Sequence, residues 1–196
     1  MSTEKATIQH RSLVGTFLLA TGLFIASLLI GLGEPLTQSQ EVAEELGRTV
    51  GPLLERGPVA LFILIFLNNS LKALGAMLLG VFFGLPPAIL IILNGYIVGL
   101  VVGLLGPEAG YGAVLAALLP HGVIEVPAML LAMALGMSIG REAFRRLFRQ
   151  DGRVFAQYRY VLRIYVRWVI PALLIAALVE VLVTPLVVEA VLRFTD

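Results

Sequence analysis

Residues 112–140 read GAVLAALLPHGVIEVPAMLLAMALGMSIG, an apolar run with few polar side chains. His121 and Glu125 lie inside it, flanked by Pro120 and Pro127. A helix that crosses a bilayer needs about 20 apolar residues, so this run is long enough to span a membrane. A histidine and a carboxylate are disfavoured in hydrocarbon unless protein or water surrounds them, so both are candidates for a functional or structural site.

The composition of the whole chain indicates a membrane protein. Of its 196 residues, 59% are hydrophobic and 14% are charged, whereas soluble domains are about 45–50% apolar and about 25% charged. The chain leaves no room for a separate globular domain beside its spans. We therefore expect one all-α membrane domain over residues 1–196, a polytopic helix bundle with about five transmembrane helices. Its apolar segments are 12–32, 58–84, 86–105, 112–140 and 165–192.

Proline and glycine predict a kinked or discontinuous fourth helix. Pro120 and Pro127 have no backbone N–H to donate, and Gly122 relaxes the helix between them. Backbone groups freed at membrane depth must be buried in protein or face water. The sequence alone leaves open whether residues 112–122 form a kinked span or a re-entrant hairpin.

Basic residues predict the orientation. Segment 141–167 is rich in arginine and poor in acidic residues, so we expect it to be a cytoplasmic loop of a multi-pass protein of the cell (plasma) membrane. Five spans then place the N-terminus inside and the C-terminus outside, with the acidic, amphipathic segment 34–57 on the outer surface. Arginines at helical spacing in the loop are candidates for contact with anionic lipid headgroups or a partner. They are Arg141, Arg145, Arg149, Arg159, Arg163 and Arg167.

Polar side chains from four different spans predict a buried polar cluster. At about 1.5 Å of rise per residue, most of them fall near the middle of a hydrocarbon core about 30 Å thick. An ionised Lys or Glu facing lipid there costs at least about 2.5–3.5 kcal/mol, so these side chains should face one another. We expect Lys72 to pair with Glu125, with Glu180 as the rival partner. The residues are Asn68, Asn69, Lys72, Asn94, His121, Glu125 and Glu180.

Two interpretations of this cluster stay open. Discontinuous helices with polar side chains near the midplane form substrate and ion sites in many transporters. Alternatively, the same side chains hydrogen-bond across helices only to hold the bundle together, at about 0.6–2 kcal/mol each.

Glycines in the third segment form a helix-packing face. Gly95, Gly99 and Gly103 recur every fourth residue, and small residues at this spacing allow two helices to approach closely. The face is either internal to the bundle or the seam of a dimer.

Enzyme chemistry lacks the residues that it needs. The chain has no cysteine, which excludes disulfides and thiolate chemistry. His121 is the only histidine in the apolar segments, and no H-E-x-x-H motif occurs. The pattern G-x-S-x-G occurs at 136–140, but it lies inside a predicted span and not at the strand-to-helix turn that a nucleophilic serine of this type needs. We therefore predict no catalytic residue, no metal site, no cofactor and no enzymatic activity. Nucleic acid is not an expected partner.

The chain carries, in this order, Asn68-Asn69, then Leu93-Asn94-Gly95 with Gly99, then P-H-G-x-x-E-x-P-A at 120–128 followed by Gly136. Taken together, these elements resemble the stage II sporulation protein M family over about residues 66–140. The resemblance implies a multispan helical membrane protein. It permits a scaffold role, since the namesake in endospore formers anchors a peptidoglycan-degrading engulfment complex. It implies neither sporulation nor any site residue.

Two functions follow as hypotheses. The first is a non-enzymatic membrane scaffold or assembly factor that acts through helix–helix contacts and its arginine-rich segment. Its expected partners are the lipid bilayer, other membrane proteins and further copies of the chain in a homo-oligomer. The alternative is a small-solute or ion transporter or channel that uses the buried polar cluster.

Overall fold

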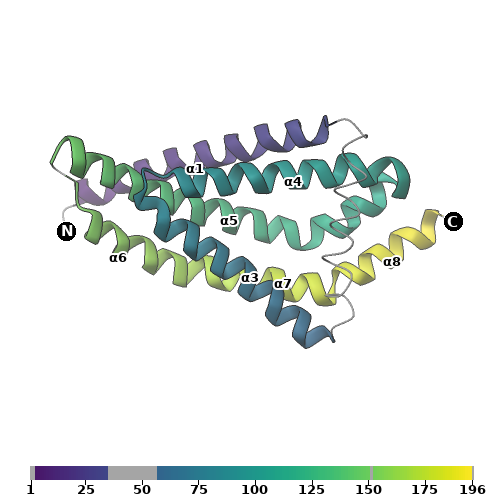
Figure 1. The fold of residues 1–196 in the computed structure, drawn as a ribbon. Coiled ribbons are helices and arrows are strands. Elements are labelled where there is room, and N and C mark those ends of the chain that lie inside the picture. Colours follow the sequence, from purple (N-terminus) through teal and green to yellow (C-terminus); the bar gives the residue numbers. More distant parts are fainter. Residues whose placement is uncertain (1–2, 35–56, 151, 196) are drawn as a thin grey trace.

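The computed structural model describes residues 3–34, 57–150 and 152–195 (Figure 1). These residues form helices, without a strand among them. The predicted outer segment 34–57 lies, apart from its two end residues, outside the described residues. The helices are α1 (Thr3–Leu32), α3 (Pro58–Leu78), η1 (Leu79–Val81), α4 (Leu85–Ala109), α5 (Tyr111–Phe148), α6 (Val154–Ile164), η2 (Tyr165–Val169), α7 (Ile170–Leu182) and α8 (Thr184–Thr195).

Five of the described stretches are long and apolar enough to cross a membrane. This confirms the prediction of an all-α polytopic bundle. The N- and C-terminal ends lie at opposite ends of the elongated molecule, as an odd number of spans requires (Figure 1). Which end faces the cytoplasm stays a prediction. The stretches are Leu13–Leu32, Pro58–Val81, Leu85–Ala109, Tyr111–Phe148 and Val154–Leu182.

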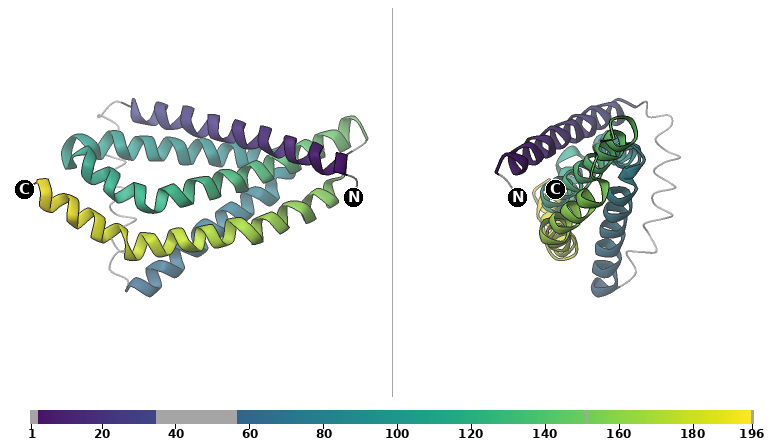
Figure 2. Two further views of the ribbon diagram at one scale, coloured as in Figure 1. Left: turned by 180° about the vertical axis from the view of Figure 1, so that it is seen from behind. Right: turned by 90° about the vertical axis from the view of Figure 1, so that its left-hand side faces the viewer.

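Helix α5 is the centre of the bundle. It contacts α1, α3, α4, α6, α7 and α8, and it lies between α1 and α3 (Figure 2). Its 38 residues are helical throughout, although Pro120 and Pro127 lie inside it, and its path bends (Figures 1 and 2). Proline removes a backbone hydrogen bond and crowds the preceding turn, which kinks a helix. The fourth span is therefore kinked and continuous, and residues 112–122 do not form a hairpin.

The glycine face of α4 packs against α1. A Cβ atom on Gly95 would collide with Ser27 Oγ, and one on Gly99 would collide with the carbonyl oxygen of Leu28. A Cβ on Gly103 would lie 2.9 Å from the carbonyl oxygen of Leu32. In the described bundle, this face is thus an internal seam where two backbones nearly touch.

A second close approach fixes the turn between α3 and α4 against α5. A Cβ on Gly80 would collide with the backbone of Gly136, and one on Gly140 would collide with the backbone at Gly84. Gly84 has φ 77°, in the left-handed region that glycine adopts without strain. The small residues at 136 and 140 therefore hold the end of α3 against α5.

The arginine-rich segment differs from its predicted form. Residues 141–167 are not mainly a loop, because α5 continues to Phe148 and α6 begins at Val154. Arginine is a good helix former, and α6 continues directly into η2 with a buried stripe that includes Val161 of α6 and Tyr165 of η2 and packs on the bundle. Only a short turn interrupts the helices.

The fifth span also differs from its predicted limits of 165–192. It begins at Val154 and ends at Leu182, and α8 follows as a separate helix. Pro185 lies in the first turn of α8, where its missing N–H is tolerated. The same proline would disrupt the interior of a helix, so α7 does not continue through it.

Candidate functional site

Three helices bring four of the predicted polar residues together. Nδ1 of His121 on α5 pairs with Oε2 of Glu180 on α7. Glu125, one turn further along α5, interacts electrostatically with His121, with Glu180 and with Lys72 of α3. We call these four residues the polar cluster. In the described part of the chain, its direct ion pair is His121 with Glu180, whereas Lys72 acts on Glu125 through charge at longer range.

Local structure explains why these side chains meet. His121 and Glu125 share a face of α5 because they are four residues apart. Glu180 lies in the last turn of α7, and the buried Thr184 at the start of α8 has its hydroxyl 3.4 Å from a Glu180 carboxylate oxygen. The α7–α8 junction thus helps to orient the acceptor of the ion pair.

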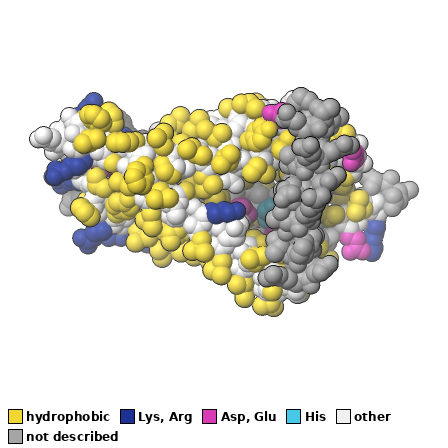
Figure 3. Space-filling view, viewed as in Figure 1, with side chains coloured by type: hydrophobic (Ala, Val, Ile, Leu, Met, Phe, Trp, Pro, Cys, Tyr) yellow, Lys and Arg dark blue, Asp and Glu magenta, His cyan; other side chains and the backbone are white. Residues whose placement is uncertain are grey.

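The polar cluster is only partly enclosed. The side chains of His121 and Glu180 keep 17% and 31% of their surface exposed, and Lys72 is exposed on α3. Figure 3 shows basic, acidic and histidine side chains gathered in a hollowed part of an otherwise apolar face, about midway along the molecule. Because the interior of a membrane is apolar, this hollow is the main polar feature that the face presents to it.

The predicted asparagines occupy different surroundings. Asn68 is exposed, and its Nδ2 donates to Oδ1 of the half-buried Asn69 at 3.3 Å. Asn94 donates to the carbonyl oxygen of Leu90 in its own helix at 2.7 Å. Asn94 also lines a cavity of about 70 Å³ that Glu125 lines from α5, among apolar side chains such as Phe24 of α1. The cavity has room for a few water molecules but is far smaller than the roughly 300–1,000 Å³ of ordinary ligand pockets.

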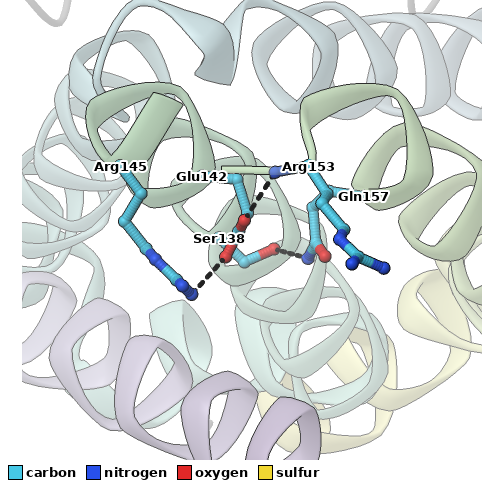
Figure 4. Close-up of polar contacts among 5 residues, drawn as sticks. All are labelled: Ser138, Glu142, Arg145, Arg153 and Gln157. Atoms are coloured by element: carbon cyan, nitrogen blue, oxygen red, sulfur yellow. Dashed lines mark hydrogen bonds and ion pairs between the residues drawn. The ribbon is translucent and has the colours of Figure 1, made fainter. Parts of the chain in front are cut away.

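A separate set of polar contacts joins α5 to α6 near their turn (Figure 4). Nε2 of the buried Gln157 donates to Ser138 Oγ at 2.8 Å, and Ser138 donates to the carbonyl oxygen of Leu135. Glu142 accepts from the backbone N–H of Arg153 at 3.0 Å and from Arg145 at 3.2 Å. Sequence reasoning missed this set. The available signal was that Ser138 is an isolated polar residue in the apolar run of α5.

The predicted arginine contacts divide between two helices. Arg141, Arg145 and Arg149 lie in or just after the last turns of α5, where Arg145 is engaged by Glu142. Arg159 and Arg163 lie on α6, and Arg167 lies on η2. These last three are all exposed. Basic side chains gather at this end of the molecule (Figure 3).

A metal centre finds no support in the described residues. They contain no group of three or more His, Cys, Asp or Glu side chains arranged to hold a metal ion.

These features define a class, a multispan α-helical membrane protein whose helices share a partly enclosed polar cluster. A sequence profile of the stage II sporulation protein M family matches residues 14–185. The chain therefore belongs to that family, and the match extends well beyond the motifs in residues 66–140.

Similarity to individual proteins is more limited. The chain is 38% identical over 68 residues to an uncharacterized protein of Methanocaldococcus jannaschii. That match covers 34% of this chain and 38% of the relative. No solved structure matches the chain.

Proposed function

We propose that the protein is a non-enzymatic scaffold or assembly factor of the plasma membrane that binds partner helices through α3. The observation that carries this proposal is the exposure of Asn68 and Lys72 on a membrane-spanning helix. A lysine that faces lipid deep in a bilayer is unfavourable by at least about 2.5–3.5 kcal/mol. A partner helix that supplies an acidic or amide side chain removes this cost.

The surroundings of these residues suit a helix interface. Leu71 and Ile63 are 63% and 48% exposed beside them, so polar side chains lie within an apolar surface, as is usual between membrane helices. Helix α3 contacts α5 and α7 but makes little contact with α4. Its N-terminal end diverges from α1 and α4 (Figure 1). The first partner to consider is a second copy of the chain in a homo-oligomer.

Cross-linking tests this proposal, since the chain has no native cysteine. Leu71→Cys on α3 and Leu18→Cys on α1 are matched positions, 63% and 65% exposed. In native membranes treated with a bifunctional thiol reagent or a thiol-specific photocross-linker, Leu71→Cys should give products with a second copy or another membrane protein, and Leu18→Cys should not. If neither position yields a product, α3 faces only lipid and the scaffold proposal is wrong.

A transport function is the second candidate, and the position of the polar cluster favours it. His121 and Glu125 lie in the proline-containing part of α5, and Glu125 borders the small cavity that Asn94 lines. A cavity of this size suits water or a small ion rather than a larger solute.

Thiol accessibility separates the two functions. Single cysteines at positions 94, 121 and 125 are treated in intact membranes with a small, membrane-impermeant thiol reagent. If they react, water reaches the polar cluster and transport becomes the better proposal. If only control cysteines in the turns react, the cluster is dry and the scaffold proposal is favoured.

A further inference from the structure

Three arginines form a ladder along one face of α6 and η2. Arg159, Arg163 and Arg167 are each four residues apart, so their side chains follow one another at steps of about 6 Å. The buried stripe of the same helix includes Gln157, Val161 and Tyr165, and each of its members precedes an arginine by two residues. A two-residue offset turns the side chain about 200° around a helix. The ladder therefore points away from the bundle.

The ladder borders a shallow, widely open groove on the outer face of the same helix, with apolar side chains beside the arginines. The groove has a volume of about 480 Å³, and Leu162 and Val166 line it together with the three arginines. Both apolar side chains are exposed, at 45% and 55%. Within the part of the chain that the structure describes, no acidic side chain forms an ion pair with Arg159 or Arg163. The groove thus offers positive charge beside an uncovered apolar surface.

The length of the fifth span places this groove at the membrane surface. Val154–Leu182 contains 29 residues, or about 43 Å of helix, whereas the hydrocarbon core is about 30 Å thick. The surplus lies most naturally at the α6 end, because arginine is far costlier in hydrocarbon than the apolar residues of α7. Arg159 then lies at headgroup level. Arg163 and Arg167 lie deeper, but their long side chains extend so that the guanidinium groups approach the headgroups.

Trp168 marks the same boundary. Its side chain is 62% exposed, and the guanidinium carbon of Arg167 lies 5.9 Å from the centre of its ring. Tryptophan is enriched at membrane–water interfaces, where its ring sits at headgroup level.

We propose that this face of α6 and η2 binds the headgroup of an anionic phospholipid. The guanidinium groups bind the phosphate, for which their planar pairs of donors are well matched. The acyl chains lie on Leu162 and Val166. This proposal concerns a different face of the molecule from α3, and it stands whether the protein is a scaffold or a transporter.

Trp168 is the only tryptophan in the chain, so it reports directly on the lipids beside the ladder. The full-length protein is reconstituted into vesicles of one fixed mixture of phosphatidylglycerol and phosphatidylcholine. In one preparation the acyl chains of the phosphatidylglycerol are brominated, and in the other those of the phosphatidylcholine, in equal amounts. We expect brominated phosphatidylglycerol to quench Trp168 fluorescence more strongly. Phosphatidylglycerol should be enriched over phosphatidylcholine beside Trp168 by a factor on the order of fivefold for each arginine that binds a headgroup.

Two double variants test whether the groove itself is responsible. Arg159→Gln with Arg163→Gln should reduce the preference to about that of the bulk mixture, and it leaves the Arg167–Trp168 contact in place. Arg146→Gln with Arg149→Gln removes the same charge from exposed positions at the same end of the molecule and should keep most of the preference.

Two results would overturn the proposal. Equal loss in both double variants would mean diffuse attraction to a charged surface without a site. Equal quenching by the two brominated lipids in the unaltered chain would mean that the arginines do not select an anionic lipid. Their binding partner would then be an acidic segment of another protein. This second comparison needs no variant, so it decides the matter even if a substituted chain does not fold.

Discussion

Helices α3 and α4 are neighbours in sequence but treat their polar and small residues in opposite ways. Helix α4 buries Gly95 and Gly99 against the backbone of α1, and its Asn94 hydrogen-bonds within its own helix. Helix α3 also carries polar side chains, but Asn68 and Lys72 are exposed on its surface. The asparagine of α4 bonds within its own helix, whereas Asn68 and Lys72 of α3 stay exposed, although Asn68 donates to Asn69 and Lys72 interacts with Glu125 at longer range.

The difference teaches where stability and function are located. Close backbone packing, as between α1 and α4, strengthens dispersion contacts and needs no other molecule. Polar side chains at the surface of a span are costly and persist only where something else binds them. We therefore expect changes at the α1–α4 seam to affect folding most, and changes on α3 to affect assembly.

The largest effect is expected from Gly99→Ala. The added Cβ would collide with the carbonyl oxygen of Leu28, so α1 and α4 must separate, at a cost of about 1–3 kcal/mol or more. Gly75→Ala on α3 is the matched control, because a Cβ there has nothing within 4 Å. The control should gain up to about 1 kcal/mol from helix propensity. Unfolding of both variants in mixed micelles measures the contrast, and equal effects would mean that the seam is loose.

The next largest effect is expected from His121→Ala, which leaves Glu180 without its charge partner. Removing one member of a fully buried ion pair costs about 3–5 kcal/mol, but partial exposure of this pair should reduce the cost to about 1–3 kcal/mol. Substituting both residues should cost less than the sum of the single changes. Additive costs in a double-mutant cycle would show that the two side chains do not interact.

The fold was largely predictable, because long apolar runs leave few alternatives. Hydropathy alone locates the first four spans, and the P-H-G-x-x-E-x-P-A element predicts the kink in α5. The limits of the fifth span were less accessible. In the sequence, Arg159 and Arg163 indicate a loop. Only the tertiary contacts of Val161 and Tyr165 show that this stretch is part of the fifth span.

The polar cluster was predictable as a set but not as a list of partners. The expected depth of each side chain in the membrane, and the free-energy cost of a charge that faces lipid, predicted that His121, Glu125, Glu180 and Lys72 lie in one region. The pairing of His121 with Glu180 depends on how the kink turns α5 toward α7, and no sequence pattern records that rotation. The Ser138–Gln157 contact escaped for a similar reason, because it joins helices that the arginine-rich turn separates.

A smaller effect is expected from Ser138→Ala. Gln157 loses an acceptor in a buried setting, which should lower the free energy of unfolding by about 1 kcal/mol. The closely matched control is Ser27→Ala on α1, since the Ser27 hydroxyl is also buried but donates only within its own helix. The control should change stability less. If Ser138→Ala is as neutral as the control, the link between α5 and α6 depends on Glu142 instead.

The smallest effect on stability, and the largest on assembly, is expected from Lys72→Leu. This change removes a charge from the exposed face of α3, and Lys72 has no direct ion pair in the described structure. The isolated chain should therefore unfold at an unchanged or slightly higher temperature, while cross-linking from Leu71→Cys declines. A marked loss of stability in the isolated chain would mean that the fold itself depends on the interaction of Lys72 with Glu125. Helix α3 would then resemble α4, and the partner surface would have to lie elsewhere.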